Sequence, residues 1–308
     1  MRVVITGATG AVGRALIKTL CGMGSEILVL GRPGSPRNAG LSEINGVELA
    51  ECELADIKNF CREKADRYDC FFHLGWGGTT GDARNDMHLQ NKNVEYTLDA
   101  VDLASRLGCK VFVGTGSQAE YGRVEGKLSS STPAFPENGY GMAKLCAGQM
   151  SRIKCQQLGI KHVWARILSV YGEYDTENSM VMATVNKLLS EIVPEFTAGE
   201  QIWDYMYSED AAKALVAIAQ KGRDGAVYCL GSGRPAQLRE YIEMIRDAVD
   251  PTASLGIGKV PYAKNQVMYL CADITELTRD TGFVPEYSFE EGIARTVEWA
   301  RSRYAALV

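Results

Sequence analysis

Histidine and paired cysteines are scarce in this chain. Its 308 residues include three histidines and nine cysteines, and no two cysteines form a Cys-x-x-Cys pair. The histidines also lack the spacing of metal ligands, so the sequence predicts neither a metal site nor a disulfide framework. Cys70, Cys109 and Cys229 stand in apolar runs, which is typical of small core residues in a reduced, cytosolic protein.

Long apolar runs and basic stretches are also missing. No apolar run approaches the roughly 20 residues that span a membrane. Residues 1–5 pass directly into an expected strand, which leaves no room for a signal peptide. The net charge is -5 and no basic stretch is interleaved with aromatic residues, so nucleic acid is not an expected partner. We therefore expect a cytoplasmic protein that acts on a small molecule, without a membrane partner.

Short apolar runs alternate with longer segments of helical period over the first half of the chain. The expected strands are Val3–Thr6, Ile27–Leu30, Val47–Ala50, Cys70–Leu74, Val111–Gly114 and His162–Ile167. The expected helices are Ala11–Met23, Lys58–Ala65, Asn93–Leu107 and Gly141–Leu158. Alternation of this kind predicts right-handed crossovers and a parallel sheet with helices on both faces. The expected fold class is α/β, with a Rossmann-type doubly wound parallel sheet.

The pattern becomes irregular after Tyr171-Gly172. The elements expected there are a helix at Ser179–Ser190, a strand pair near Phe196–Tyr207, a helix at Ser208–Gln220, a strand at Val227–Leu230, and helices at Gln237–Val249 and Phe289–Tyr304. We interpret residues 1–171 as a dinucleotide-binding domain. Residues 172–308 are expected to form mainly a smaller, interleaved substrate-binding lobe, with segments near 206–232 returning to the main sheet.

A glycine-rich turn follows the first expected strand and opens the first expected helix. Glycines there permit a tight turn, a close approach of the backbone to a diphosphate, and tight packing of helix on strand. The free N–H groups and the dipole of the helix favour the negative phosphates. The residues predicted to bind a cofactor in this turn are Thr6, Gly7, Thr9, Gly10, Ala11, Val12 and Gly13.

Two arginines follow the second expected strand, where an acid would select NAD. Such an acid holds the 2′-hydroxyl of the adenosine ribose. Arg32 and Arg37 suit a 2′-phosphate instead, through charge-assisted hydrogen bonds. The sequence therefore favours NADP(H), with NAD(H) as the alternative cofactor. The alternative interpretation of both arginines is that they are solvated loop residues.

Tyr140 and Lys144 are four residues apart at the start of an expected helix, so both side chains lie on one helix face. A lysine ammonium near a tyrosine favours the phenolate and lowers the pKa of the tyrosine. Such a tyrosine can give a proton to a carbonyl, or take one from an alcohol, as hydride moves. Ser117 lies upstream in a glycine-rich turn at a strand end, where its hydroxyl can hold a substrate oxygen.

The glycine turn, Ser117 and Tyr140-x-x-x-Lys144 together resemble the extended short-chain dehydrogenase/reductase superfamily, in its nucleotide-sugar epimerase/dehydratase group. Other segments that resemble motifs of this family are Cys52–Asp56, His73–Trp76, Asn93–Thr97, Arg166–Gly172, Asp204–Asp210 and Gly282–Pro285. The resemblance implies that Tyr140 is the general acid/base, that Lys144 binds the nicotinamide ribose and tunes Tyr140, and that Ser117 polarises the substrate oxygen.

The resemblance also implies a set of binding residues outside the glycine turn. Cofactor contacts are expected at Glu53, Leu54, Leu74, Gly75, Asn93 and Ile167, besides Tyr140 and Lys144. Substrate contacts are expected at Trp76, Ser117, Gln118, Ser169 and Arg279. For Asn93 a bracing role is an equal alternative, and Trp76 either lines the substrate cleft or only packs.

The residues directly after Ser117 bear on the reaction. Dehydratases of this family place an acid pair there, and Gln118 and Ala119 cannot transfer those protons. Epimerases of the family usually carry the NAD-selecting acid that this chain lacks. The run 116–122 is similar to that of 4-ketohexose reductases of the CDP-abequose and CDP-paratose synthase type. The resemblance therefore implies NADPH-dependent reduction of the C4 keto group of a nucleotide-linked 4-keto-6-deoxyhexose, with an NAD(P)-dependent 4-epimerase as the alternative.

Two residues, Trp203 and Arg279, leave it undecided whether the substrate is a nucleotide sugar. The family often has an arginine just before the aspartate of the Asp204 motif, to grip the diphosphate of a nucleotide sugar, and this chain has Trp203. Arg279 matches a second arginine position and could hold the diphosphate alone. Further alternatives are a reductase of a non-nucleotide carbonyl compound and a non-catalytic NADP(H)-binding redox sensor. Family members commonly dimerise through two long helices, here Asn93–Leu107 and Gly141–Leu158, so a homodimer is expected.

Overall fold

Seven parallel strands form the main sheet of the computed structural model, which describes residues 1–62 and 67–305. The strands are β1 (Arg2–Thr6), β2 (Glu26–Gly31), β3 (Val47–Glu51), β4 (Cys70–His73), β5 (Val111–Ser117), β6 (Lys161–Ile167) and β10 (Ala226–Leu230). Their order is β10-β6-β5-β4-β1-β2-β3, and every neighbouring pair is parallel. The expected doubly wound α/β fold is confirmed.

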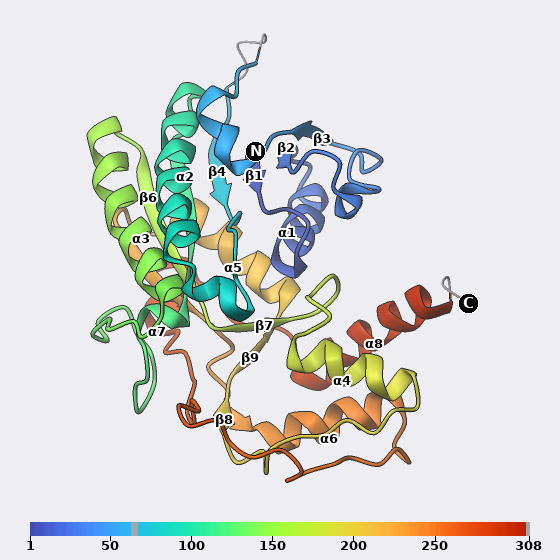
Figure 1. The fold of residues 1–308 in the computed structure, drawn as a ribbon. Helices are drawn as coiled ribbons and strands as arrows, with labels where there is room; N and C mark the ends of the chain where they lie inside the picture. The colour runs from blue at the N-terminus through green and yellow to red at the C-terminus, as the bar shows by residue number, and fades with distance from the viewer. Residues whose placement is uncertain (63–66, 306–308) are drawn as a thin grey trace.

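Helices cover both faces of this sheet (Figure 1). They are α1 (Ala11–Gly22), α2 (Met87–Arg106), α3 (Gly139–Leu158) and α5 (Ser208–Lys221). Alternate residues of β1 face the two cores: Val3 and Ile5 pack with residues of α1 and α5, and Val4 packs with residues of α2. In the described part of the chain, no helix combines the length and the apolar character that a membrane crossing requires.

Two expected helices of the first half differ from the structure. The helix expected at Asn93–Leu107 begins earlier, because the Asp86 side chain caps α2 by accepting two backbone N–H groups of its first turn, each at 3.1 Å. The helix expected at Lys58–Ala65 is largely wrong. The chain forms the 3-10 helix η2 (Leu54–Asn59), and residues 60–62 after it are not helical. Residues 63–65 of that prediction lie outside the described residues.

The second half supplies the remaining elements. They are β7 (Ser169–Tyr171), α4 (Met180–Leu189), β8 (Ile202–Trp203), β9 (Tyr205–Tyr207), β11 (Ala236–Gln237), α6 (Leu238–Val249), α7 (Thr275–Thr281) and α8 (Phe289–Ala305), with the 3-10 helices η1 (Pro36–Asn38), η3 (Gly81–Asn85) and η4 (Gln118–Glu120) in the first half. Helix α7 was not expected. Strand β10 lies in the main sheet and α5 lies on its face, whereas the division of the chain at residue 171 stays a prediction.

The strand pair expected near Phe196–Tyr207 is wrong as a pair. Strand β8 pairs with β11 and β9 pairs with β7. Only Asp204 separates β8 from β9, which is too short a connection for a hairpin. The buried Asp204 carboxylate instead accepts hydrogen bonds from the backbone N–H groups of Ser232 (2.8 Å), Gly233 (3.0 Å) and Ala272 (3.0 Å). It therefore joins three distant segments of the chain.

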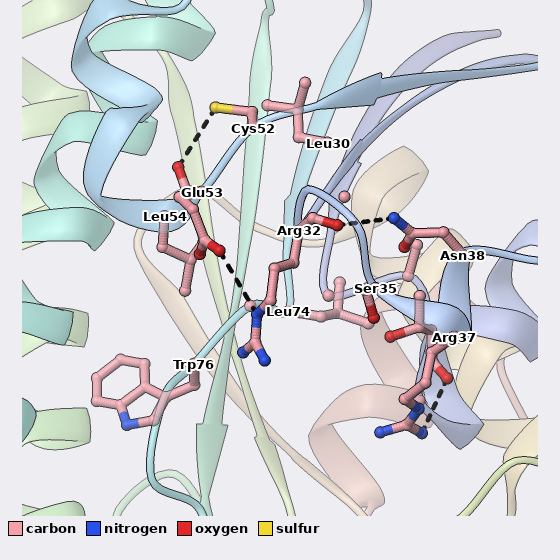
Figure 2. A pocket seen from close by; sticks show the side chains of 16 residues that line it. Leu30, Arg32, Ser35, Arg37, Asn38, Cys52, Glu53, Leu54, Leu74 and Trp76 are labelled. Atoms are coloured by element: carbon pink, nitrogen blue, oxygen red, sulfur yellow. Dashed lines mark hydrogen bonds and ion pairs between the residues drawn. The ribbon is translucent and has the colours of Figure 1, made fainter.

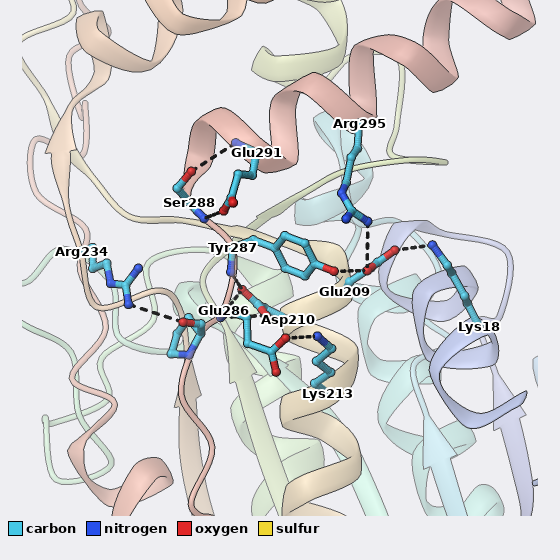
Figure 3. A network of polar contacts seen from close by, with 11 residues as sticks. Lys18, Glu209, Asp210, Lys213, Arg234, Glu286, Tyr287, Ser288, Glu291 and Arg295 are labelled. Carbon is cyan, nitrogen blue, oxygen red and sulfur yellow. Dashed lines mark hydrogen bonds and ion pairs between the residues drawn. The ribbon is translucent and has the colours of Figure 1, made fainter. Parts of the chain in front are cut away.

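The start of α5 ties the C-terminal helix to the first half of the molecule (Figure 3). Asp210 accepts two consecutive backbone N–H groups, one of them from Tyr287 at 3.0 Å. Glu209 accepts the Tyr287 hydroxyl at 2.8 Å and forms ion pairs with Lys18 of α1 and Arg295 of α8. Carboxylates at a helix N-terminus also interact favourably with the helix dipole. This network fixes α8 relative to the main sheet.

Candidate active site

A cavity opens at the carboxyl ends of β1, β2, β3 and β4 (Figure 2). Its lining residues are Gly7, Ala8, Thr9, Gly10, Leu30, Gly31, Arg32, Ser35, Arg37, Asn38, Cys52, Glu53, Leu54, Leu74, Gly75 and Trp76. The glycine turn, both arginines, and the residues after β3 and β4 therefore meet in one place. Crevices outside the carboxyl ends of parallel strands are where nucleotides bind in folds of this kind.

The glycine turn fits a bound diphosphate. Gly7 has a φ of +71°, and a Cβ there would lie 2.6 Å from the backbone nitrogen of Gly75. A Cβ on Gly13 would lie 2.5 Å from the carbonyl oxygen of Gly7, so helix and strand pack without space for a side chain. A Cβ on Gly10 would have no neighbour within 4 Å, and Gly10 gives α1 no side-chain cap. The N-terminus of α1 thus has no side-chain cap, and Gly10 at that end lines the cavity, which suits a phosphate that accepts from helix N–H groups.

The two arginines of the cavity differ in their contacts. Arg37 donates to the carbonyl oxygens of Thr9 (3.0 Å) and Tyr174 (3.1 Å). The Arg32 side chain is 73% exposed, and its Nε lies 3.8 Å from a Glu53 carboxylate oxygen. Figure 2 shows Arg32 beside Glu53 and apart from Arg37. Arg32 can therefore turn toward a ligand at little cost, while Arg37 already holds two backbone segments together.

Some residues predicted to bind the cofactor lie outside the lining of this cavity. They are Thr6, Ala11, Val12, Gly13, Asn93 and Ile167. The buried Thr6 hydroxyl bonds with His73 Nδ1 (2.9 Å) and accepts the N–H of Gly75 (3.1 Å). The Asn93 amide accepts the N–H of Gly77 (2.8 Å) and donates to its carbonyl oxygen (2.9 Å). Thr6 and Asn93 thus brace the turn after β4. Burial lowers the pKa of the neighbouring His73 to about 3, so His73 is a neutral core residue.

Ser117, Tyr140 and Lys144 come together at the same sheet edge. Ser117 is the last residue of β5, while Tyr140 and Lys144 occupy the first turns of α3, whose N-terminus is capped by the Asn138 side chain. The Ser117 side chain is near enough to the Tyr140 phenol to lower its pKa. Lys144 Nζ donates to the carbonyl oxygen of Thr115 at 2.6 Å. The end of β5 and the four-residue spacing on α3 therefore bring the three predicted catalytic residues together, and we call this group the reactive centre.

The surroundings of Tyr140 differ from the expectation. Burial raises the pKa of Tyr140, and the Ser117 side chain and the Arg84 cation oppose that rise. The Arg84 guanidinium carbon lies 4.4 Å from the centre of the Tyr140 ring, whereas Lys144 Nζ lies 5.9 Å from it. The expectation that Lys144 lowers the pKa of Tyr140 is therefore corrected. Arg84 belongs to η3, far from Tyr140 in sequence, and no sequence pattern marked it.

Lys144 is buried next to aromatic side chains. Burial lowers the pKa of Lys144 to about 7, against the opposing effect of the Glu120 carboxylate. Its Nζ lies 3.9 Å from the centre of a Trp76 ring, in a cation–π contact. Trp76 also meets the Tyr140 ring edge to face, with the centroids 6.1 Å apart, and donates its indole N–H to Gln90 (2.9 Å). Trp76 therefore packs directly on both members of the Tyr140–Lys144 pair.

Glu120 is a buried acid beneath Ser117 to which the sequence assigned no role. Its carboxylate accepts the backbone N–H of Ser117 (2.8 Å), the indole N–H of Trp164 (3.0 Å) and Arg166 Nε (2.6 Å). Two signals could have revealed it. Ser117 and Glu120 have the spacing of a capping box, and Arg166 interrupts an otherwise apolar buried strand, where a charge needs a partner.

The residues predicted to bind substrate are scattered. Gln118 follows Ser117 directly in η4, and the Ser169 hydroxyl accepts the indole N–H of Trp203 (2.8 Å). Arg279 is misplaced for this role: it is exposed on α7 and pairs with Asp280. The same carboxylate binds Arg223, which precedes β10 and so lies toward the amino edge of the sheet, opposite the reactive centre. Within residues 1–62 and 67–305, no group of three or more His, Cys, Asp or Glu side chains could hold a metal ion.

Comparison with known proteins decides the family. The model of the NAD dependent epimerase/dehydratase family matches residues 3–231. The chain belongs to this family. The family is the extended short-chain dehydrogenase/reductase group that the sequence resembled, so that prediction is confirmed, and the chain is an enzyme of the oxidoreductase type.

The relatives of this family member catalyse different reactions. The dTDP-glucose 4,6-dehydratase of Streptomyces griseus is 24% identical, with 96% of this chain and 93% of that protein covered. The dTDP-6-deoxy-L-talose 4-dehydrogenase (NAD(+)) of Aggregatibacter actinomycetemcomitans is 27% identical, with 79% and 88% covered. In fold the chain is similar to a UDP-N-acetylglucosamine 4-epimerase of Methanobrevibacter ruminantium M1, with a TM-score of 0.87, 21% identity and 98% of each chain covered. Family membership alone therefore does not select the reaction.

Replacement of Tyr140 by Phe tests the reactive centre. We expect Y140F to lose about 100-fold or more in turnover, because a positioned general acid contributes a factor of that order. Binding of NADPH, measured by fluorescence quenching, should stay within about twofold, because the substitution removes only a hydroxyl. The control is Y96F, on a half-buried α2 tyrosine away from the centre. Full activity in Y140F would exclude Tyr140 as the proton donor.

Proposed function

We propose that this enzyme uses NADPH to reduce the C4 keto group of a nucleotide-linked 4-keto-6-deoxyhexose. The proposal is carried by Ser117 and Tyr140 beside Lys144, at the same sheet edge as the glycine-lined cavity. Gln118 and Ala119 follow Ser117 directly and cannot supply the acid and base that dehydration needs. The relationship to a 4-dehydrogenase of a dTDP-linked 6-deoxysugar supports the same substrate class.

The residues of the centre divide the proton chemistry between them. NADPH, when bound, supplies the hydride for C4. Tyr140 donates its phenolic proton to the carbonyl oxygen, so that the ketone becomes an alcohol, and Ser117 polarises that oxygen beforehand. Burial keeps Tyr140 in the protonated form that reduction needs, and the nearby Arg84 cation stabilises the phenolate left after transfer. Lys144 binds the nicotinamide ribose.

The preference for NADP(H) rests on Arg32 and Arg37. The exposed Arg32 guanidinium lines the cavity at the end of β2, where the chain has no acid. A 2′-phosphate there would gain charge-assisted hydrogen bonds. Glu53 favours the alternative, because its carboxylate lines the same cavity and suits ribose hydroxyls. An NAD-dependent 4-epimerase is therefore the second candidate.

Steady-state oxidation of NADPH and NADH over a panel of 4-keto nucleotide sugars tests the proposed reaction. We expect consumption of NADPH in proportion to the alcohol formed, with a higher kcat/KM than for NADH. Interconversion of two sugars without net coenzyme consumption would establish the epimerase instead. Turnover confined to ketones without a nucleotide would change the substrate class, and NADPH binding without turnover on any ketone would favour the redox sensor.

Replacement of Arg32 by Ala tests the cofactor preference. We expect R32A to weaken NADPH binding about tenfold, near 1.4 kcal/mol, since an exposed charged hydrogen bond is worth that order. NADH affinity should stay within about twofold. Fluorescence titration measures both, and R239A on the surface of α6 is the matched control. An equal loss for NADPH and NADH would show that Arg32 does not read the 2′-phosphate.

The expected homodimer would use the outer face of α3. Met142, Cys146, Met150 and Ile153 are exposed at helical spacing along α3, which packs beside α2. We expect sedimentation equilibrium to give twice the mass of the chain, and I153E to give a monomer because it would bury an unpaired charge. V193E, at an exposed valine outside this face, should stay dimeric. A monomeric wild-type protein would exclude the dimer.

A further inference from the structure

Glu120 combines full burial with direct contact to the reactive centre. The side chain has 0% exposure and belongs to η4, immediately after Ser117. One carboxylate oxygen accepts the N–H groups of Ser117 and Trp164, and the other accepts Arg166 Nε. The packing is tight, because a Cβ on Gly116 would lie 2.2 Å from Glu120 Oε1. The carboxylate is therefore fixed in place with both oxygens bonded.

The fold alone does not account for a charge at this position. The N–H groups of Ser117 and Trp164 need only a neutral acceptor. Burying a carboxylate and a guanidinium costs several kcal/mol per ion, and their attraction often no more than offsets that cost. Arg166 has a further contact, with its guanidinium carbon 4.4 Å from the centre of the Tyr121 ring. A structure built for stability alone could replace the Glu120–Arg166 pair with neutral polar side chains that still accept these two N–H groups.

The charges that face Lys144 come from several elements. On its own helix, Lys144 faces the neutral phenol of Tyr140, and Trp76 and the Thr115 carbonyl oxygen contact its Nζ. His73 of β4 interacts with Lys144 electrostatically and is neutral. The guanidinium carbon of Arg84 in η3 lies 4.4 Å from the centre of the Tyr140 ring. Glu120 and Lys144 both contact the last residues of β5, because Lys144 Nζ donates to the Thr115 carbonyl oxygen and Glu120 accepts the N–H of Ser117, two residues further on. Among these surroundings Glu120 is the anion, and its charge opposes burial, which lowers the pKa of Lys144 to about 7.

We propose that Glu120 is a positioning residue of the reactive centre: it orients Ser117 through the backbone N–H, and its buried negative charge keeps Lys144 an ammonium. The role rests on the proposed Ser117–Tyr140–Lys144 chemistry and holds for reductase and epimerase alike. Lys144 as an ammonium can donate to the ribose hydroxyls and to Thr115, whereas neutral Lys144 would lose a proton and a charge-assisted bond. Arg166 Nε donates to the Glu120 carboxylate and holds it in place.

The variant E120Q keeps the shape of Glu120 and removes its charge. Without the anion, the pKa of Lys144 should fall further below about 7. Activity that needs the ammonium is lost as pH rises through that pKa, so the alkaline limb of the kcat/KM profile should move to lower pH, by about one unit. Loss of Glu120 also lowers the pKa of Tyr140, which moves the same limb in the same direction for reduction.

A second variant separates charge from stability. E120Q leaves Arg166 buried without an anion and should lower the melting temperature, whereas E120Q/R166Q restores a neutral amide pair and should recover much of that loss. Both variants should show the shifted alkaline limb. A limb that returns to its wild-type position in the double variant, or never moves in E120Q, would reduce Glu120 to a structural role and overturn the proposal.

Direct titration of Lys144 keeps this test independent of turnover. Protein with ¹³C-labelled lysine side chains, with K144M for assignment, gives the Lys144 titration by NMR. We expect the midpoint to be lower in E120Q than in wild type, and an unchanged midpoint would overturn the proposal. If wild type turns over no ketone or sugar but the midpoint still moves, the proposed function fails and the link between Glu120 and Lys144 stands.

Discussion

Every strand of the main sheet runs in the same direction, so the carboxyl ends of all seven meet at one edge. The turn after β1, the arginine after β2, the acid after β3 and the serine at the end of β5 are distant in sequence and adjacent there. The close approach of Gly7 to the backbone of Gly75 fixes two of these turns against each other. Helix α3 then starts beside β5 and brings Tyr140 and Lys144 to the same edge.

Burial is the second constraint, because it disfavours the charged forms of three groups at this sheet edge. It raises the pKa of Tyr140 and lowers those of Lys144 and His73. The polar groups placed around them decide how far each shift goes. Arg84 and Ser117 act on the phenol, and the buried Glu120 acts on the ammonium. The centre therefore combines the Ser–Tyr–Lys set of its family with two further charges.

Polar contacts hold distant segments of the second half of the chain together. Asp204 joins the 203–205 segment to two distant turns, and the network at the start of α5 anchors α8. Trp203 stands where related enzymes often carry an arginine, and it bonds to Ser169 rather than presenting a charge. Arg279, which the resemblance implied for the diphosphate of a nucleotide sugar, is exposed on α7 and pairs with Asp280.

Patterns that are local in sequence determined much of this protein. The alternation of strands and helices, the glycine turn, and the four-residue spacing of Tyr140 and Lys144 were sufficient to predict the doubly wound sheet and the reactive set, because each depends on residues within one or two turns of each other. The four-residue spacing also suggested Lys144 as the cation that tunes Tyr140, and the family resemblance placed Arg279 at the substrate. Tertiary structure decided otherwise, since the direction of α7 and the position of η3 depend on packing between distant segments.

The Glu120–Arg166 pair, 46 residues apart, shows the limit most clearly. Both residues can be read in the sequence, but their pairing cannot. The register of β5 against β6 brings them together beneath Ser117. Chemistry that requires a particular residue in a short motif can be predicted from the sequence. The electrostatic environment that sets how that chemistry proceeds depends on distances between segments, and only the folded chain defines those distances.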